Sequence, residues 1–252
     1  NFMALLPALG VLYKLNKPLA LLAGIHRGFV PVAPGQEGNA DPEHSWNMEF
    51  GGRWTSKRLR ADVVGFVTQH SNLKGNCTFS SGCNPADVGT EFNGGEVQTL
   101  GAEVAFSGLL RPAKGWRAPW KVTYTWTNAT FQTAFQSSNP TWGRVKEGDL
   151  LPYIPPHQLA LQAGIGKRRW ELNVAYRFTA KMRNEAGQGD DDRFTDAASI
   201  IDLGASFSVL KWLQVYATVN NLLDERYVTS LRPFGARPGM PRFVVGGVKL
   251  KR

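Results

Sequence analysis

The sequence lacks any long apolar run. A membrane-spanning helix needs about 20 consecutive, mostly apolar residues, and no stretch of the 252 residues approaches that length. The mean hydropathy is −0.25, and helical periodicity, in which apolar residues recur every three or four positions, is convincing nowhere. Membrane helices and helical bundles are therefore excluded, and the chain is expected to be all-β.

The sequence also lacks a basic run of the nucleic-acid-binding type. Its 29 Lys and Arg exceed its 20 Asp and Glu, which gives a formal net charge of +9, but the cations are spread over strands and loops. A dispersed positive charge favours anionic partners such as lipid A phosphates or an acidic ligand. We expect no nucleic-acid partner.

A secretory leader is absent as well. The first residues, "NFMALLPALGVLYKLNKP", contain no initiator Met, no charged leading segment and no cleavage site, so they are not a signal peptide. They already read as a strand. We therefore expect the chain to begin inside a larger protein.

Catalytic and metal-binding patterns are missing too. The four histidines, His26, His44, His70 and His157, are scattered near expected strand ends with no Ser or Asp at a telling spacing. We expect no enzyme, no metal site and no cofactor.

Cysteine is scarce. Cys77 and Cys83 are the two cysteines, and they lie in one polar loop, "CTFSSGC". The pair predicts a disulfide and an oxidising compartment, because a metal site needs more ligands than two cysteines and none lies close in sequence.

What the sequence has in quantity is alternation of apolar and polar residues. In "WKVTYTWTNAT", Trp120, Val122 and Tyr124 fall on one side of a strand, whereas Lys121 and Thr123 fall on the other. Two structures have such strands. One is a soluble β-sandwich with the aromatic side in its core, and the other is a membrane barrel with the aromatic side toward lipid and the polar side toward a wet lumen.

The connections between the alternating segments favour the barrel. Seven segments alternate, near 45–54, 59–67, 97–107, 120–130, 157–165, 169–179 and 213–221. Adding the segments near 4–15, 19–28, 198–208 and 242–251 gives about eleven expected strands. Short connections near 16–18, 55–57, 166–168 and 210–211, and an intermediate one near 108–119, separate long ones near 29–44, 71–95, 136–156, 182–197 and 224–241. Alternating short and long connections are typical of an antiparallel up-and-down transmembrane β-barrel with periplasmic turns and extracellular loops. Strands of about ten to twelve residues also suit the ~9–11 residues that cross a bilayer at a tilt.

Three motifs, in this order, resemble TonB-dependent outer-membrane receptors. The first, "HRGFVPVAPGQEGNADPEHSWNMEFGGRW", resembles that family's R-x-F…P-E-x-S-x-x-x-E-x-G stretch, and the second, "FNGGEVQTLGAEVAF", resembles its recurrent Gly-Glu-Val strand. The third is the end of the chain, where the matching residues are Asn220, Asn221, Leu222, Asp224, Tyr227, Pro238, Gly239, Pro241 and Arg242. The loop with the cysteines and "FNGGEV" are similar to receptors of the ferric-citrate type. The chain departs from the family in ending on "KLKR", because the family usually ends on an aromatic residue that the assembly machinery reads.

The resemblance implies a fold and a function. Such receptors are barrels of about 22 strands with an N-terminal plug domain, so residues 1–252 would be the C-terminal half of the barrel, without the plug or the N-terminal strands. The implied function is binding and import of a ferric chelate, a siderophore or ferric citrate, across the bacterial outer membrane. The implied partners are the chelate, the TonB complex acting through the plug, lipopolysaccharide and outer-membrane lipid, and the barrel-assembly machinery. A passive porin and a soluble β-sandwich module remain the alternatives.

Candidate ligand-binding residues are cations and aromatics of the long loops. Arginine forks suit carboxylate-bearing chelates, although loop cations often hold lipopolysaccharide phosphates or neighbouring acids instead. The run Asp190–Asp192 has the chemistry to bind Ca²⁺, but a solvated acidic loop is the favoured interpretation, in keeping with no expected metal site. The candidate residues for the chelate are Arg27, His44, Arg144, Arg183, Arg193, Arg232 and Arg237, with Lys74, Lys146 and Arg226 as further loop cations.

Overall fold

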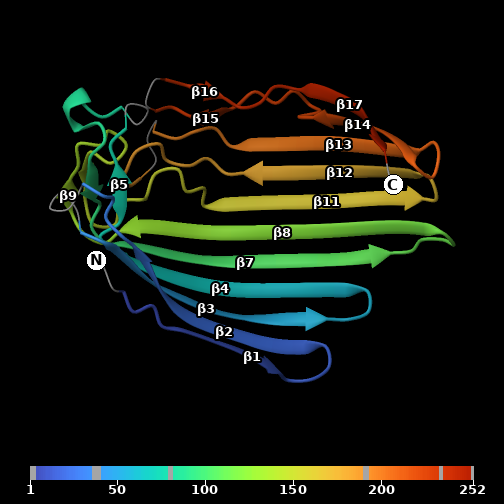
Figure 1. Cartoon of the computed structure of the whole chain (residues 1–252), viewed down its shortest axis with the longest axis horizontal. Helices are drawn as coiled ribbons and strands as arrows, with labels where there is room; N and C mark the ends of the chain where they lie inside the picture. Colours follow the sequence, from blue (N-terminus) through green and yellow to red (C-terminus); the bar gives the residue numbers. More distant parts are fainter. Residues whose placement is uncertain (1–3, 36–40, 79–81, 190–192, 233–234, 251–252) are drawn as a thin grey trace.

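A single large antiparallel sheet dominates the computed structural model, which describes residues 4–35, 41–78, 82–189, 193–232 and 235–250 (Figure 1). The sheet has 11 strands, and each strand is hydrogen-bonded to the next sheet strand along the chain. This is the up-and-down order expected from the sequence. In spatial order the strands are β1 (Ala8–Lys14), β2 (Leu19–Val30), β3 (Glu43–Thr55), β4 (Leu59–Ser71), β7 (Val97–Leu110), β8 (Trp116–Phe131), β11 (His157–Lys167), β12 (Trp170–Thr179), β13 (Ala198–Ser208), β14 (Leu213–Asn220) and β17 (Phe243–Leu250).

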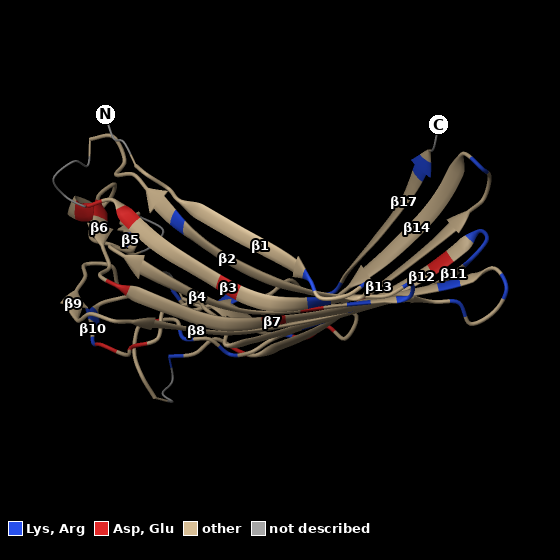
Figure 2. Cartoon of the chain, turned by 90° about the horizontal axis from the view of Figure 1, so that it is seen from below, with Lys and Arg blue, Asp and Glu red and all other residues tan. Residues whose placement is uncertain are grey.

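The sheet is strongly curved and does not close on itself (Figure 2). Its outermost strands are β1 and β17, and each has one sheet neighbour in the part of the chain that the structure describes. Such an open, curved sheet is the shape of a barrel segment.

The two faces of the sheet differ as the alternation predicts. Val122 in β8 lies opposite Phe106 in β7 and Leu161 in β11, whereas Thr123 lies opposite Ala105 and Ala160. We call the side that carries Val122 the apolar face and the side that carries Thr123 the polar face. Large apolar side chains on the apolar face are exposed, among them Phe50 at 64% and Val63 at 48%.

That exposure decides between the two alternatives for the strand pattern. A soluble sandwich covers its apolar face with a second sheet, but the other sheets among the described residues have two strands each. Lipid is the environment in which an uncovered apolar face is stable. The described residues include no helix long and apolar enough to cross a membrane.

The connections separate by length onto the two ends of the strands. Those at one end are residues 15–18, 56–58, 111–115, 168–169 and 209–212, and we call this the short-turn end. The intermediate connection expected near 108–119 is shorter than the sequence indicates, because β7 continues to Leu110 and β8 already begins at Trp116.

The connections at the other end, the long-loop end, contain structure that alternation did not predict. Three two-stranded hairpins and a short 3₁₀ helix lie inside regions expected to be plain loops. They are β5 (Lys74–Asn76) with β6 (Glu91–Asn93), β9 (Phe135–Gln136) with β10 (Arg144–Val145), β15 (Val228–Ser230) with β16 (Arg237–Pro238), and η2 (Pro85–Asp87).

The best-buried cluster of apolar side chains lies at the long-loop end. Val97, Phe131, Val145 and Ala186 form it, and Trp142 packs against them. Val97 and Phe131 are register partners. Phe131 has the same parity as Thr123, which means that it lies an even number of residues from Thr123 in β8. Phe131 and its partner Val97 therefore both lie on the polar face. The loops therefore fold inward over the end of the polar face.

Candidate functional site

The loops at the long-loop end pack against one another around Trp142. Its ring meets Phe131 edge to face at 5.7 Å and Phe92 of β6 at 5.1 Å. Trp142 thereby joins the end of β8, the β9–β10 loop and the β5–β6 hairpin. Aromatic contacts of this kind hold loops in one arrangement, which a binding surface requires.

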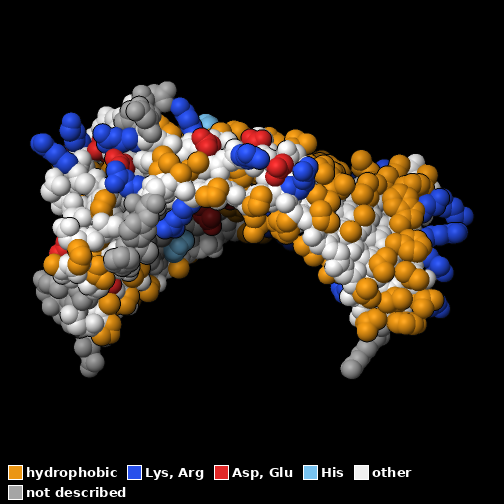
Figure 3. All heavy atoms as spheres, turned by 90° about the horizontal axis from the view of Figure 1, so that it is seen from above, with side chains coloured by type: hydrophobic (Ala, Val, Ile, Leu, Met, Phe, Trp, Pro, Cys, Tyr) orange, Lys and Arg blue, Asp and Glu red, His pale blue; other side chains and the backbone are white. Residues whose placement is uncertain are grey.

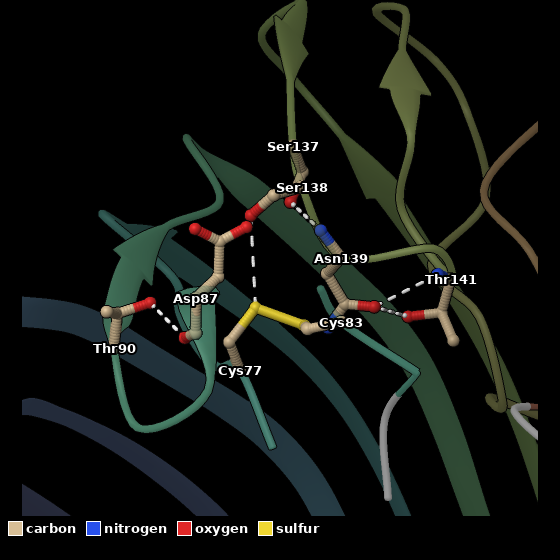
Figure 4. Close-up of a disulfide and its surroundings, with 8 residues drawn as sticks. All are labelled: Cys77, Cys83, Asp87, Thr90, Ser137, Ser138, Asn139 and Thr141. Atoms are coloured by element: carbon tan, nitrogen blue, oxygen red, sulfur yellow. Dashed lines mark hydrogen bonds between the residues drawn. A yellow bond between two sulfur atoms is a disulfide. The ribbon is translucent and has the colours of Figure 1, made fainter. Parts of the chain in front are cut away.

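The disulfide expected from the sequence is present between Cys77 and Cys83, and both cysteines are buried. The backbone around it is closed by two hydrogen bonds, since the Cys77 amide donates to Thr90 O at 2.9 Å and the Gly89 amide donates to Cys77 O at 2.8 Å. Cys77 Sγ lies 3.8 Å from Ser138 Oγ of the β9–β10 loop (Figure 4). The disulfide thus fixes a loop that touches its neighbour.

Lys74 is a bracing residue within the loops. Its ammonium donates to Glu91 Oε2 and to Pro31 O, both at 2.7 Å, and Glu91 also accepts from the Ala33 amide at 3.0 Å. The Lys74 side chain is only 7% exposed. The bond from Lys74, together with the bond from Ala33, holds the pKa of the Glu91 carboxyl below its ordinary value. These contacts join the β2–β3 loop to the β5–β6 hairpin.

Arg27 and His44 lie on the apolar face. Arg27 is the register partner of Trp46, and His44 is that of Phe29. The Arg27 guanidinium lies 3.3 Å from His44 Nδ1, and the rings of Phe29 and His44 are 5.3 Å apart. The pair therefore faces the outside of the sheet near the long-loop end.

Arg183 is almost fully buried, with 2% of its surface exposed. Its Nε donates to Glu185 O at 3.1 Å, its Nη1 donates to Gly189 O at 3.0 Å, and the guanidinium lies 5.1 Å from the centroid of the Phe194 ring. It braces the β12–β13 loop from within.

Arg193 and Arg232 meet at one carboxylate. Arg193 Nη1 lies 3.2 Å from Glu185 Oε2, and Arg232 pairs with Oε1 of the same group. The Glu185 side chain is 16% exposed, against 56% for Arg193 and 40% for Arg232. Two partly exposed arginines from the β12–β13 and β14–β17 loops thus meet at the Glu185 carboxylate.

The remaining candidate cations are dispersed. Arg144 lies in β10 and Arg237 in β16, and both are exposed members of separate two-stranded sheets. Lys146 and Arg226 are also exposed. The structure therefore brings Arg193 and Arg232 together and leaves these four apart. Asp190–Asp192 lie outside the described residues.

A hollow at the mouth of the polar face was missed by the sequence reasoning. It has a volume of about 410 Å³ and lies beneath the β12–β13 and β14–β17 loops. Arg177 lines it and pairs with Asp202 at 2.8 Å. The alternation places Arg177 on the polar face, but which loops would cover it depends on tertiary contacts. The other polar lining residues include Thr179, Thr195, Asp196, Tyr227 and Thr229.

A second hollow of about 390 Å³ lies further along the same face. Gly164 and Gly204 leave room in its wall, and Lys121, Gln162 and Asn173 supply polar groups. Together the two hollows extend along the polar face from the loops toward the short-turn end.

The motif near the C-terminus forms a compact corner. Asn221 is 3% exposed and adopts the left-handed conformation with φ 50°. Its side chain donates to Glu225 O at 2.9 Å and to Met240 O at 3.0 Å, and it accepts from the Glu225 amide at 2.9 Å. Asp224 accepts from the Arg242 amide at 3.0 Å. These bonds fix the point where the last loop returns into β17.

Gly239 explains another motif position. It lies against the ring of Tyr227, where a Cβ would overlap the ring atoms, and its amide donates to Tyr227 O at 2.7 Å. The motif residues therefore shape the loop corner.

Comparison with known proteins agrees with this fold. Residues 1–222 match the family described as TonB dependent receptor-like, beta-barrel. The chain belongs to the TonB-dependent receptor β-barrel family, whose members are outer-membrane transport receptors. No curated protein sequence matches it.

Solved structures share the fold at low sequence identity. The ferric-catecholate import receptor Fiu from K12 E. coli is 21% identical with a TM-score of 0.69, and 96% of this chain covers 34% of that one. The siderophore receptor PiuA from Acinetobacter baumannii is 18% identical with a TM-score of 0.72, and 96% of this chain covers 35% of it. The ferric yersiniabactin uptake receptor FyuA from Yersinia pestis is 19% identical with a TM-score of 0.68, and 96% of this chain covers 36% of it. The chain thus spans about a third of the length of these receptors.

Proposed function

We propose that the whole protein binds a ferric chelate at its long-loop end and imports it across the outer membrane with energy delivered through TonB. The observation that carries this proposal is the folding of the loops over a polar, hollowed face that continues along the strands. Family membership and the ferric-siderophore receptors among the similar structures support it.

The proposal includes the place of this chain in the whole protein. The eleven sheet strands would form the C-terminal half of a barrel of about 22 strands, and the remaining strands and a plug domain would lie upstream. An open sheet edge in lipid leaves backbone groups without hydrogen-bond partners, at a cost of several kcal/mol for each group. Completion by further strands removes that cost.

Within the loops, Arg193 and Arg232 are the best-placed ligand groups. Both are exposed, both converge on Glu185, and the mouth hollow lies beneath the same two loops. An anionic chelate gains charge-assisted hydrogen bonds from two guanidinium groups that are already close together. Arg144 and Arg237 stay candidates, whereas Arg183 and Lys74 contribute by bracing.

Uptake of radiolabelled iron tests the proposal in cells that lack the chromosomal copy of the receptor. The full-length receptor should restore uptake of one or more of a panel of ferric catecholates, hydroxamates and citrate, and deletion of TonB should abolish uptake while leaving surface binding intact. Uptake that is equal with and without TonB would favour the passive porin. Radiolabelled copper is tested in a separate uptake assay, because a copper transporter, OprC, shares the fold with a TM-score of 0.69.

A pair of substitutions locates the ligand. Arg193→Ala combined with Arg232→Ala should weaken chelate binding by about tenfold or more, as expected for losing two charge-assisted hydrogen bonds. Lys57→Ala, at the short-turn end, removes a cation where an external ligand does not reach and should leave binding unchanged. Equal binding by all three proteins would remove these arginines from the site.

A further inference from the structure

The short-turn end is strongly cationic. Its five connections, residues 15–18, 56–58, 111–115, 168–169 and 209–212, contain no Asp or Glu. Figure 2 shows Lys and Arg on the turns at this end. Six of the cations lie on or next to the three adjacent turns between β7 and β14, namely Arg111, Lys114, Lys167, Arg168, Arg169 and Lys211. We call these six residues the basic rim.

The turns of the basic rim are neighbours in space. Lys167 in β11 is the register partner of both Trp116 in β8 and Trp170 in β12. The Ser208 amide donates to Arg169 O at 2.6 Å, which ties the β11–β12 turn to the end of β13. The six cations therefore occupy one continuous part of the edge.

A tryptophan row on the apolar face lies directly beside the basic rim. Trp116 and Trp170 meet edge to face at 5.1 Å, and Lys167 Nζ lies 5.1 Å from the centroid of the Trp116 ring. Lys167 has the parity of Leu161, so it too lies on the apolar face. Trp212, in the next turn, is 54% exposed. Figure 3 shows the same juxtaposition of blue cations and orange apolar side chains at this end of the molecule.

Tryptophan beside lysine on the apolar face suits the boundary between lipid hydrocarbon and lipid headgroups. Tryptophan settles at the boundary between hydrocarbon and headgroups, and a lysine on the lipid side extends its ammonium toward the headgroups. The nearest acid along these strands, Glu171, has the parity of Asn173 and lies on the polar face. Among the described residues of these strands, no acid on the apolar face therefore competes for the cations.

We propose that the basic rim, with Trp116 and Trp170, binds the phosphate headgroups of anionic phospholipids in the periplasmic leaflet of the outer membrane. Short turns face the periplasm in outer-membrane barrels, so this end meets the phospholipid leaflet, whereas lipopolysaccharide occupies the opposite leaflet. Five exposed cations and one half-buried cation beside an aromatic row complement a phosphate layer in both charge and depth.

Native mass spectrometry of the full-length receptor, purified in detergent, tests the proposal. Phosphatidylglycerol and cardiolipin should remain bound, and phosphatidylethanolamine should not. The variant Lys167→Gln/Arg168→Gln/Arg169→Gln should lower the affinity for the anionic lipids by about tenfold or more, because each cation near an anionic surface contributes measurably to binding.

A matched control removes the same charge from the same end. The variant Lys17→Gln/Lys57→Gln/Arg58→Gln lies in the β1–β2 and β3–β4 turns, away from the tryptophan row, and should retain the anionic lipids. Equal losses in both variants would show non-specific charge attraction and overturn the proposal. Unchanged lipid binding in the rim variant, or preferential retention of lipopolysaccharide by the rim, would also overturn it. If the triple variant fails to assemble, the single exposed substitution Arg168→Gln gives the same comparison.

Discussion

Substituting Val122 by Arg tests which face of the sheet meets lipid. Val122 lies on the apolar face between Phe106 and Leu161, six residues beyond Trp116 at the start of β8. A strand rises about 3.3 Å per residue, which becomes about 2.3 Å along the membrane normal at a tilt near 45°. Val122 therefore lies roughly 14 Å above the tryptophan row, near the middle of an apolar band about 25 Å tall.

The position sets the size of the effect. An arginine at the bilayer midplane costs about 2–4 kcal/mol, which corresponds to roughly a 30- to 700-fold shift in the folding equilibrium. Thr123→Arg is the matched control, because Thr123 lies on the polar face opposite Ala105 and Ala160, where an arginine can reach water. We expect its cost to stay below about 1 kcal/mol.

The assay is urea-dependent refolding of the full-length barrel into lipid vesicles, with the folded fraction read from the heat-modifiable band in gel electrophoresis. A clearly larger loss for Val122→Arg than for Thr123→Arg is the expected result. Equal losses, or a larger loss for Thr123→Arg, would refute the assignment of the faces.

Three further predictions concern the long-loop end. Replacing Cys77 and Cys83 together by Ser should destabilise the folded loop by about 2 kcal/mol, because the disulfide no longer restricts the entropy of the unfolded chain. Protease sensitivity of the β5–β6 region measures this loss, and unchanged sensitivity would contradict the prediction. Because the folded pKa of Glu91 lies below the ordinary 4.5, its ion pair stabilises the loop above pH 4.5, and this stabilisation is lost as the pH falls through the folded pKa. Loop proteolysis across pH 3–7 should therefore increase at low pH in the parent but not in Glu91→Gln, and identical profiles for the two proteins would contradict the prediction. Asn221→Ala should cost about 2–3 kcal/mol by leaving buried backbone groups unpaired, whereas Asn220→Ala, at the half-buried neighbouring position, should cost less in the same refolding titration.

Most of the sheet could be predicted from the sequence, and the reason is physical. Each strand has two environments, so a period of two residues runs through most of the strands, and the turns occur where it stops. The eleven strands, their order and the two classes of connection follow from that signal. The start of β8 was misplaced because Pro119 argues against a strand interior, although Trp116, Arg117 and Ala118 keep the alternation and already lie in the strand.

The loops were less predictable because long-range contacts shape them. Hairpins of two or three residues carry no usable period, and they are held instead by Trp142 and by the disulfide. Nothing local distinguishes Arg183, which is buried against carbonyl groups, from an exposed loop arginine such as Arg144. For Arg27 a signal was present, since it has the parity of Phe29 and therefore belongs to the apolar face.

Expression of residues 1–252 with and without the upstream part of the receptor tests the account most directly. Alone, the chain should require detergent or lipid and should yield no heat-modifiable, protease-resistant barrel, because the free edges of β1 and β17 expose backbone groups that hydrocarbon does not satisfy. Co-expression with the upstream part should restore the resistant barrel. A monodisperse, water-soluble monomer that unfolds cooperatively would contradict the account, because the apolar face would then have to be covered by protein instead of lipid.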